Sequence, residues 1–360
     1  MNSNEVDRDV LVDTYHKQVI KKLAILSACV LGIVLIFGLL SVTTYNMMSL
    51  GEAYKIIINH ILGNEYPMRT PEWWADLYIW DSAIPRGLVA VIAGASLAAA
   101  GSLMQSLMNN PLADPYSTGI SSGACFGAVS AIVAGISFNV LSSGSGIVFN
   151  AFLGSMIPAM LMIIISKKIQ MTPATLILIG TALSYFFNSM VTYMMVITDA
   201  DTLQSAYLWQ VGTLDNVSWD SIPQMLAMTA IGVAFTLIMS RQLNIMALGD
   251  ASAKTLGVDV DKFRLICLII MAVMTAAVVS YVGIIGFVGL VAPHIVRLVV
   301  GSDNKFVIPI SMATGAFLLI LADYLALTVD VPVGVIMSII GSPIFFALIV
   351  WQRKSYGAIY

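Results

Sequence analysis

Charged residues are scarce in this sequence. Only 10% of its 360 residues are Asp, Glu, Lys or Arg, 59% are hydrophobic, and the mean hydropathy is +0.91. A soluble domain carries about 25% charged residues, because its surface must face water. The composition therefore predicts an integral membrane protein, whose solvent is itself apolar. The net charge of −3 also argues against nucleic acid as a partner, which would require a basic face.

Cysteine and histidine are few and scattered. The three cysteines, Cys29, Cys125 and Cys267, lie in separate apolar runs, and no metal spacing or disulfide framework can be read from them. A phosphate-binding loop is also missing, because the dipeptide Gly-Lys never occurs. We therefore expect no catalytic residue, no metal and no cofactor in this chain. Energy for any work must come from an ion gradient or from another chain.

Long apolar runs, by contrast, fill the sequence. A membrane-spanning helix needs about 20 mainly apolar residues. Runs of this kind cover residues 23–44, 86–108, 117–138, 147–166, 174–198, 222–240, 264–283, 285–300, 306–328 and 333–351. They predict an all-α integral membrane protein with about ten transmembrane helices. Residues 1–20 would be an N-terminal tail, 21–354 one polytopic domain, and 355–360 a C-terminal tail.

The basic residues favour one orientation of these spans. If the N-terminus is cytosolic, all but three of the 17 basic residues fall in cytosolic segments, the exceptions being Lys55, Arg69 and Arg86. This distribution obeys the positive-inside rule. An even number of spans then places the C-terminal end in the cytosol as well. The outer loop 45–85 is acidic instead, and its Trp73 and Trp80 are typical of membrane-interface anchors, as is Trp74.

Asp323 is the clearest acid inside a predicted span. A carboxylate at the centre of a spanning helix costs about 2.5–3.5 kcal/mol on insertion scales, so it needs a partner. We expect a hydrogen bond to a neighbouring helix, and a proton relay is the alternative. Gradient-driven carriers usually hold several such groups. Their scarcity here favours energy supplied by a partner chain, with a gradient-driven carrier as the alternative function.

One formal enzyme motif occurs at the start of a span. Residues 119–123 fit the pattern G-x-S-x-G, and His294 on a later span could serve as a base. An intramembrane serine protease is therefore a remote alternative. The simpler interpretation is that small residues let helices approach closely, as they would at Gly94, Ala98 and Gly101.

The predicted cytosolic loop 247–258 has the pattern of a short capped helix. Asp250 can serve as the N-cap, and Gly257 can take the left-handed conformation that ends a helix. Ala253 and Leu256 would share one face. An isolated helix of this length is marginal in water, so it must pack on its own membrane domain or on a cytosolic partner.

At this loop the chain resembles the permease subunits of FecCD-type, or type II, ABC importers for iron–siderophore complexes, haem and vitamin B12. The resemblance covers roughly residues 20–354. The segments that carry it are 84–86 (IPR), 93–98 (AGASLA), 110–115 (NPLADP), 119–124 (GISSGA), 209–212 (WQVG) with Trp219, 248–250 (LGD), 256–258 (LGV), 286–297 (GFVGLVAPHIVR), 321–323 (LAD), 332–334 (PVG) and 341–343 (GSP).

The resemblance implies a transport assembly in a bacterial or archaeal plasma membrane. Two permease copies would form the pathway, an ATPase dimer carrying ATP and magnesium would dock on the cytosolic side, and a binding protein would deliver the ligand from outside. The ATPase would receive the helix near 249–257. The coupling residues implied are Leu248, Gly249, Asp250, Ala253, Leu256 and Gly257, and we expect Ala253 and Leu256 to face the ATPase.

Two further sites follow from the resemblance. Asn110, Pro111, Asp114 and Pro115 would form a rigid turn on the cytosolic side near the inner gate. Arg86 matches an arginine that meets the binding protein in the B12 member, whereas Ala83 and Leu327 stand at the other basic contact positions. We therefore expect an importer for iron–siderophore complexes, with haem and cobalamin-type ligands as alternatives.

Overall fold

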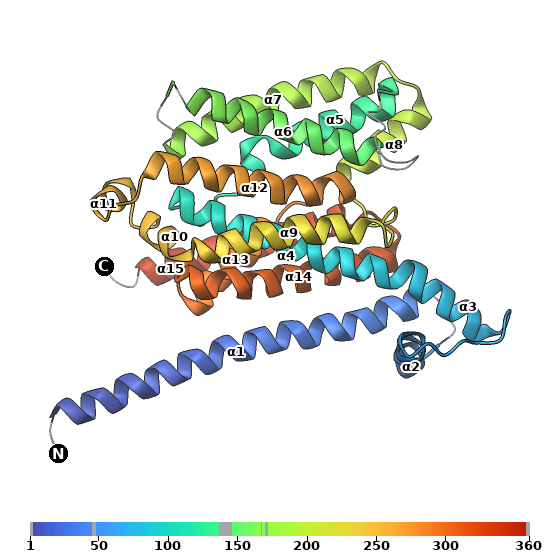
Figure 1. Ribbon diagram of the computed structural model, residues 1–360, viewed down its shortest axis with the longest axis horizontal. Coiled ribbons are helices and arrows are strands. Elements are labelled where there is room, and N and C mark those ends of the chain that lie inside the picture. Colours follow the sequence, from blue (N-terminus) through green and yellow to red (C-terminus); the bar gives the residue numbers. More distant parts are fainter. Residues whose placement is uncertain (1–2, 45–47, 137–145, 167, 170–171, 358–360) are drawn as a thin grey trace.

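The structure is a computed structural model that describes residues 3–44, 48–136, 146–166, 168–169 and 172–357. In these ranges the chain is helical and contains no strand (Figure 1). The long helices are α1 (Ser3–Thr44), α4 (Ile84–Met108), α6 (Gly146–Ser166), α7 (Pro173–Val196), α9 (Ser221–Ile238), α12 (Val260–Val282), α14 (Asn304–Val329) and α15 (Val333–Gly357). The shorter elements are α2 (Leu50–Ile61), α3 (Pro71–Tyr78), the π-helical turn η1 (Ile79–Ala83), the 3₁₀ turn η2 (Pro115–Thr118), α5 (Ile120–Ala134), α8 (Ala200–Val211), α10 (Ser240–Met246), α11 (Asp250–Thr255) and α13 (Val288–Val300).

The predicted membrane spans all correspond to helices. Eight helical segments within the described ranges are long and apolar enough to cross a bilayer. The remaining two predicted runs form α5 and α13, which are apolar but shorter. The predicted break between the runs 264–283 and 285–300 lies between Val282 and Val288. The all-α membrane fold is thus confirmed, and the part of the third run at 137–138 lies outside the described residues.

Helix α4 forms the centre of the bundle and is buried along most of its length. It packs against α9, α12, α13 and α14. Such contacts on several sides require small residues. A Cβ atom added to Gly101 would lie 1.8 Å from the carbonyl oxygen of Gly289, so a side chain there would force the two backbones apart. The prediction that small residues mediate close helix contact is confirmed at this position.

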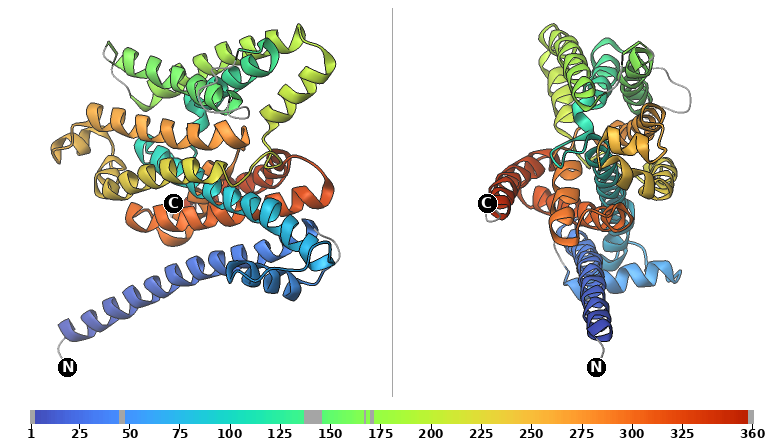
Figure 2. Two further views of the ribbon diagram at one scale, coloured as in Figure 1. Left: turned by 45° about the vertical axis from the view of Figure 1, so that its right-hand side comes forward. Right: turned by 90° about the vertical axis from the view of Figure 1, so that its left-hand side faces the viewer.

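Two helices flank the bundle on opposite edges. Helix α7 lies along one edge and α1 along the other, in both Figure 1 and the left view of Figure 2. The predicted N-terminal tail is the first part of α1 from Ser3 onwards, and residues 1–2 lie outside the described chain. Helix α15 likewise continues to Gly357, so residues 355–357 of the predicted C-terminal tail are helical, whereas 358–360 are not described.

The predicted outer loop 45–85 contains two helices that the sequence reading missed. Helix α2 begins with a capping box, in which Ser49 and Glu52 satisfy each other's backbone N–H groups. Helix α3 is capped by Thr70 and continues through η1 into α4. The π-helical turn ends two residues before Pro85, whose missing N–H interrupts the regular hydrogen-bond ladder. These helices lie at the end of the bundle opposite α10 and α11 (Figure 1).

Candidate functional site

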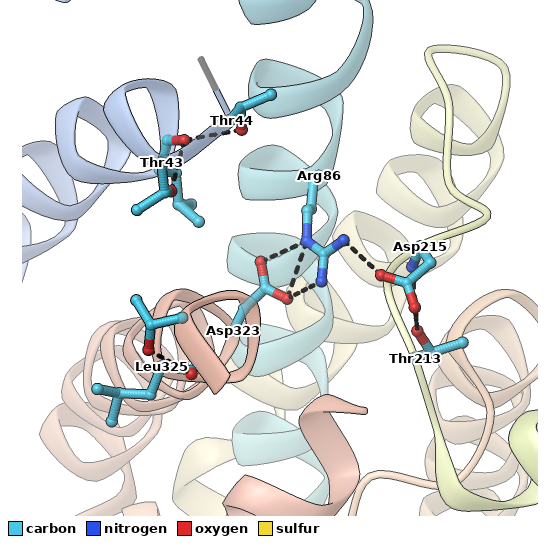
Figure 3. A network of polar contacts seen from close by, with 9 residues as sticks. Thr43, Thr44, Arg86, Thr213, Asp215, Asp323 and Leu325 are labelled. Carbon is cyan, nitrogen blue, oxygen red and sulfur yellow. Dashed lines mark hydrogen bonds and ion pairs between the residues drawn. The ribbon is translucent and has the colours of Figure 1, made fainter. Parts of the chain in front are cut away.

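Arg86 forms an ion-pair network at the end of the bundle that carries α2 and α3 (Figure 3). It lies in the first turn of α4, where its Nε donates to both carboxylate oxygens of Asp323 at 3.0 and 2.9 Å. Its NH2 also donates to Asp323 Oδ1 at 2.8 Å. The Asp323 side chain is 0% exposed, whereas that of Arg86 is 11% exposed. The expected hydrogen bond from Asp323 to a neighbouring helix is therefore present.

Asp215 provides the second carboxylate of this network. Arg86 NH1 donates to its Oδ1 at 2.6 Å, and the Asp215 side chain is 62% exposed. Partial burial raises the pKa of this carboxyl, but hydrogen bonds from Thr213 and Arg86 outweigh that effect and hold the pKa below its usual value. Asp215 is therefore charged at neutral pH. Arg86 is the residue expected to dock a binding protein, but its Nε, NH1 and NH2 groups all donate to carboxylates of its own chain.

The loop 212–220 that carries Asp215 is held at several points. Thr213 N donates to the Val282 carbonyl at the end of α12, and Gly334 N donates to the Gly212 carbonyl from α15. The indole of Trp219 donates to the Trp80 carbonyl at 2.8 Å, and the two rings lie 5.0 Å apart. The loop therefore bridges α4, α12 and α15 at the end of the bundle that carries α2 and α3.

Trp80 is part of an aromatic cluster. Its ring stacks on His60 at 3.9 Å between centroids. His60 also contacts Asp76, with Nδ1 and Oδ1 2.8 Å apart. Trp74 is exposed and Trp73 only half-buried, so these two still fit the predicted anchoring role.

Helix α11 lies at the opposite end of the bundle, where the sequence predicted the coupling helix. Its C-terminal cap is confirmed: Gly257 has φ +84, its N–H bonds to the Lys254 carbonyl, and the Val258 N–H bonds to the Ala253 carbonyl. The predicted N-cap is wrong, because Gly249 occupies that position. Asp250 lies in the first turn instead, and its carboxylate accepts a 2.6 Å hydrogen bond from Arg264 NH2 on α12.

The side chains that α11 buries and exposes differ from the prediction. Ala253 is fully buried among side chains of its own bundle, so the expectation that it faces a partner was wrong. Leu256 is 58% exposed and Leu248, just before the helix, is 62% exposed. The exposed apolar side chains on this segment are therefore those of Leu248 and Leu256. The residue pattern predicted a shared face but could not tell which side the bundle covers.

The segment of the predicted inner turn reaches into the bundle. It starts after α4, where the Asn110 side chain accepts from Leu112 N at 2.9 Å. Asp114 is half-buried and accepts from Tyr116 N at 3.0 Å. The hydroxyl of Tyr116 then donates to the Ile285 carbonyl, which lies beyond the far end of α12. A Cβ atom added to Gly289 of α13 would lie 3.4 Å from the Cδ atom of the buried Pro115. The segment thus runs from the end of α4 to the stretch between α12 and α13, and its expected role as a rigid turn near the inner gate stays a prediction.

A stripe of polar side chains on α7 was not singled out from the sequence. Thr181, Tyr185, Asn188 and Thr192 are all exposed and recur at helical spacing, which places them on one face. The two threonine hydroxyls bond to backbone carbonyls one turn earlier on α7. The Asn188 amide bonds to no other described residue. The polar periodicity within the run 174–198 was the signal that could have revealed this stripe.

An open cavity lies between α8 and α15. Its volume is about 650 Å³, and its wall includes Tyr207, Gln210 and Ser338. The wall carries no charged side chain among the described residues. Most of the wall is aliphatic, from Val211, Ile284, Val335 and Ile339, so it suits a ligand that buries apolar surface and makes a few hydrogen bonds.

The protease alternative finds no support in the geometry. Ser121 and Ser122 are buried on α5, where Gly123 lies against the backbone of Gly154. His294 is buried beside the Pro111 backbone. No serine hydroxyl bonds to either of its ring nitrogens within the described chain, so no serine–histidine pair forms there.

Comparisons with known proteins agree with this architecture. Residues 31–351 match the model of the FecCD transport family. The chain is 32% identical over 314 residues to the vitamin B12 import system permease protein BtuC of Vibrio cholerae, covering 85% of this chain and 93% of that protein. It is 34% identical to the Fe(3+)-citrate import system permease protein YfmD of Bacillus subtilis, covering 76% and 84% of the two chains.

A solved structure extends the agreement to three dimensions. A metal-chelate type ABC transporter in an inward-facing conformation superimposes with a TM-score of 0.77 at 27% identity, covering 91% of this chain and 99% of that chain. The protein therefore has the membrane ABC-permease fold and belongs to the FecCD transport family.

Proposed function

We propose that this chain is the permease subunit of an ATP-driven ABC importer and that two copies form its pathway. The match to the FecCD transport family over residues 31–351 supports the importer role, and the exposed side-chain amide of Asn188 on α7 supports the pathway formed by two copies. Asn188 lies eight residues from the end of α7, about 12 Å into the span at 1.5 Å per residue. An amide facing lipid at that depth would lack hydrogen-bond partners. A hydrated pathway closed by a second copy would supply them.

ATP on a partner chain is the energy source in this proposal. The sequence has no phosphate-binding loop, and Asp323 has both carboxylate oxygens engaged by Arg86. A proton relay through Asp323 would have to break that pair, which argues against a gradient-driven carrier. We assign ATPase docking to α11, with Leu248 and Leu256 as the apolar contacts and Gly257 as the cap that keeps the helix formed. Both termini and α11 are then cytosolic, in a plasma membrane.

A binding protein docks on the opposite, outer face around Arg86 and Asp215. Because Arg86 is mostly enclosed, a partner that reaches it must first move Asp215. A variant such as Arg86→Glu would also break the buried pair with Asp323. Asp215→Asn is the cleaner test, since it changes the exposed acid alone. We expect it to change the association rate of the binding protein and its salt dependence, as rim charges do.

Iron–siderophore complexes are the proposed ligands. Support comes from the Fe(3+)-citrate relative and the metal-chelate type structure. Haem and cobalamin-type ligands remain the alternatives, and the B12 relative makes cobalamin the first to test. Competition among ferric chelates, hemin and cobalamin for ATP-driven uptake in vesicles distinguishes them. Uptake of cobalamin alone would overturn the siderophore assignment.

The ATPase docking site is tested by co-purification. Leu256→Asp should release the ATPase, because it places a charge on an exposed apolar contact, whereas Leu256→Met should retain it. Equal recovery of the ATPase with both variants would place the docking site elsewhere. The mass of the complex in detergent tests the pair of permease copies, and a single permease copy per complex would contradict it.

A further inference from the structure

A cluster of polar side chains lies buried near α10 and centres on Arg297 of α13. Arg297 Nε donates to Gln105 Oε1 at 3.2 Å. Its NH2 donates to Ser106 Oγ at 2.7 Å and to Asn304 Oδ1 at 3.0 Å, and also to the Ser102 carbonyl at 3.1 Å. The acceptors come from the last two turns of α4 and the first turn of α14, so this arginine ties three helices together.

These partners of Arg297 are all neutral. Within the described chain no carboxylate forms an ion pair with Arg297, and its remaining contact is the Ser302 carbonyl at 3.4 Å. A largely enclosed charge without a counter-ion depends on well-placed acceptors for its stability. The position of Asn304, which is completely buried, therefore controls where the guanidinium can lie.

Asn244 on α10 holds Asn304 in place. Its Oδ1 accepts from both the backbone N and the side-chain Nδ2 of Asn304, at 2.8 Å each. Its Nδ2 donates to Asp303 Oδ1 at 2.8 Å. One amide thus fixes α10 to the turn between α13 and α14 by three hydrogen bonds.

Both ends of this cluster meet segments already assigned to transport. Only Ala247–Gly249 separates α10 from α11, and the two helices lie together at one end of the bundle (Figure 1). At the other end, Gln105 and Ser106 lie in the last turn of α4, directly before the turn that starts at Asn110. Gln105 Nε2 also donates to the Leu290 carbonyl of α13 at 3.1 Å. A displacement of α11 thus has a continuous polar route to the inner turn.

We propose that Asn244 is a positioning residue for coupled transport: it transmits movement of the α10–α11 segment to the Arg297 cluster and so to the inner turn. This inference rests on the proposed function, because it assumes that an ATPase moves α11. Asn244 touches neither ligand nor nucleotide. Its role is to keep α10 and the α13–α14 turn moving together.

The test uses the permease–ATPase complex in proteoliposomes. The reporter is Asn188→Cys on α7, combined with Cys29→Ser, because the other two cysteines are buried. The rate at which a membrane-impermeant maleimide labels the reporter is measured with and without ATP, so no transported ligand is needed. Asn244→Ala is compared with Gln242→Ala, an exposed position on the same helix. ATP hydrolysis and co-purified ATPase are measured in parallel.

We expect ATP to change the labelling rate in the reporter background and in Gln242→Ala. Asn244→Ala should reduce that change about fivefold or more, the scale of a lost coupling interaction, while ATP hydrolysis persists. The exchange pair Asn244→Asp with Asp303→Asn should restore it, because donor and acceptor are swapped while the contacts to Asn304 remain. Co-purified ATPase and ATP hydrolysis at the level of Gln242→Ala show that Asn244→Ala is folded.

The outcomes distinguish the role of Asn244 from the proposed transport function. If ATP leaves labelling unchanged in the reporter background, the proposed pathway or its ATP drive is wrong. If the background responds to ATP and Asn244→Ala responds as Gln242→Ala does, the role of Asn244 is overturned. Failure of the exchange pair to restore the response would also count against the proposed contact.

Discussion

The buried pair between Arg86 and Asp323 gives the most quantitative prediction. Arg86→Met leaves the carboxylate of Asp323, which is 0% exposed, without its cation. Removing one partner of a buried pair costs about 3–5 kcal/mol, because the other charge stays buried and uncompensated. Replacing both partners, with Arg86→Met and Asp323→Leu, should cost about 1 kcal/mol or less, since apolar side chains of similar size need no compensation.

The exposed member of the network should behave differently. Asp215→Asn removes an ion pair whose acid is 62% exposed, and such pairs contribute about 0–1 kcal/mol. Lys55→Met on α2 changes an exposed charge outside the network and should stay within about 0.5 kcal/mol. The order of destabilisation is therefore Arg86→Met first, Asp215→Asn well below it, and the double variant close to the unmodified protein.

The assay is equilibrium unfolding in mixed micelles with an increasing fraction of SDS, which gives a free energy for each variant. The unmodified protein, Arg86→Met, Asp323→Leu and the double variant form a double-mutant cycle, which yields the coupling energy between Arg86 and Asp323. An additive double variant, or an Arg86→Met cost no larger than that of Asp215→Asn, would refute the reasoning. It would mean that the pair is hydrated or that the two residues do not meet in the protein.

Three further substitutions test the packing and the coupling helix. Gly101→Ala should cost about 1–3 kcal/mol in the same unfolding assay, because its Cβ would lie 1.8 Å from the Gly289 carbonyl oxygen, whereas Gly51→Ala, which has open space, should be neutral or slightly stabilising; equal costs would contradict the close approach. Gly257→Val should fray α11, since φ +84 disfavours a branched side chain, and should lower the amount of co-purified ATPase. Unchanged recovery of the ATPase would count against the cap. Ala253→Trp should lower the SDS unfolding midpoint of the permease without any ATPase present, because Ala253 is buried. A normal midpoint together with lost ATPase binding would mean that Ala253 faces the ATPase after all.

The spans and their ends could be read from the sequence because they depend on local properties. Apolar length predicts spanning helices, and the left-handed glycine at 257 predicts a helix end. The helices α2, α3 and α8 were not predicted because they are short and only partly apolar, so no long hydrophobic run marks them. Their capping residues, Ser49, Thr70 and Asp199, were visible in the sequence as a weaker signal.

The tertiary contacts at the candidate sites were beyond a single sequence. Arg86 and Asp323 are 237 positions apart, and the local sequence around either residue does not indicate that the two form a pair. Similarly, helical spacing placed Ala253 and Leu256 on one face, but burial depends on where α10 and α12 pack. The Arg297 cluster joins side chains from four helices, and each residue alone resembles an ordinary polar residue near a helix end.

ATP-driven uptake is the measurement that tests the central claim most directly. The chain is reconstituted in vesicles with its ATPase and binding protein. Uptake of a radiolabelled ferric chelate is followed with ATP on the side of the membrane that α11 faces. We predict that uptake requires ATP and continues when a protonophore collapses the ion gradients, and that the permease alone hydrolyses no ATP. Uptake that needs no ATPase, or that stops with the protonophore while ATP stays high, would contradict the account.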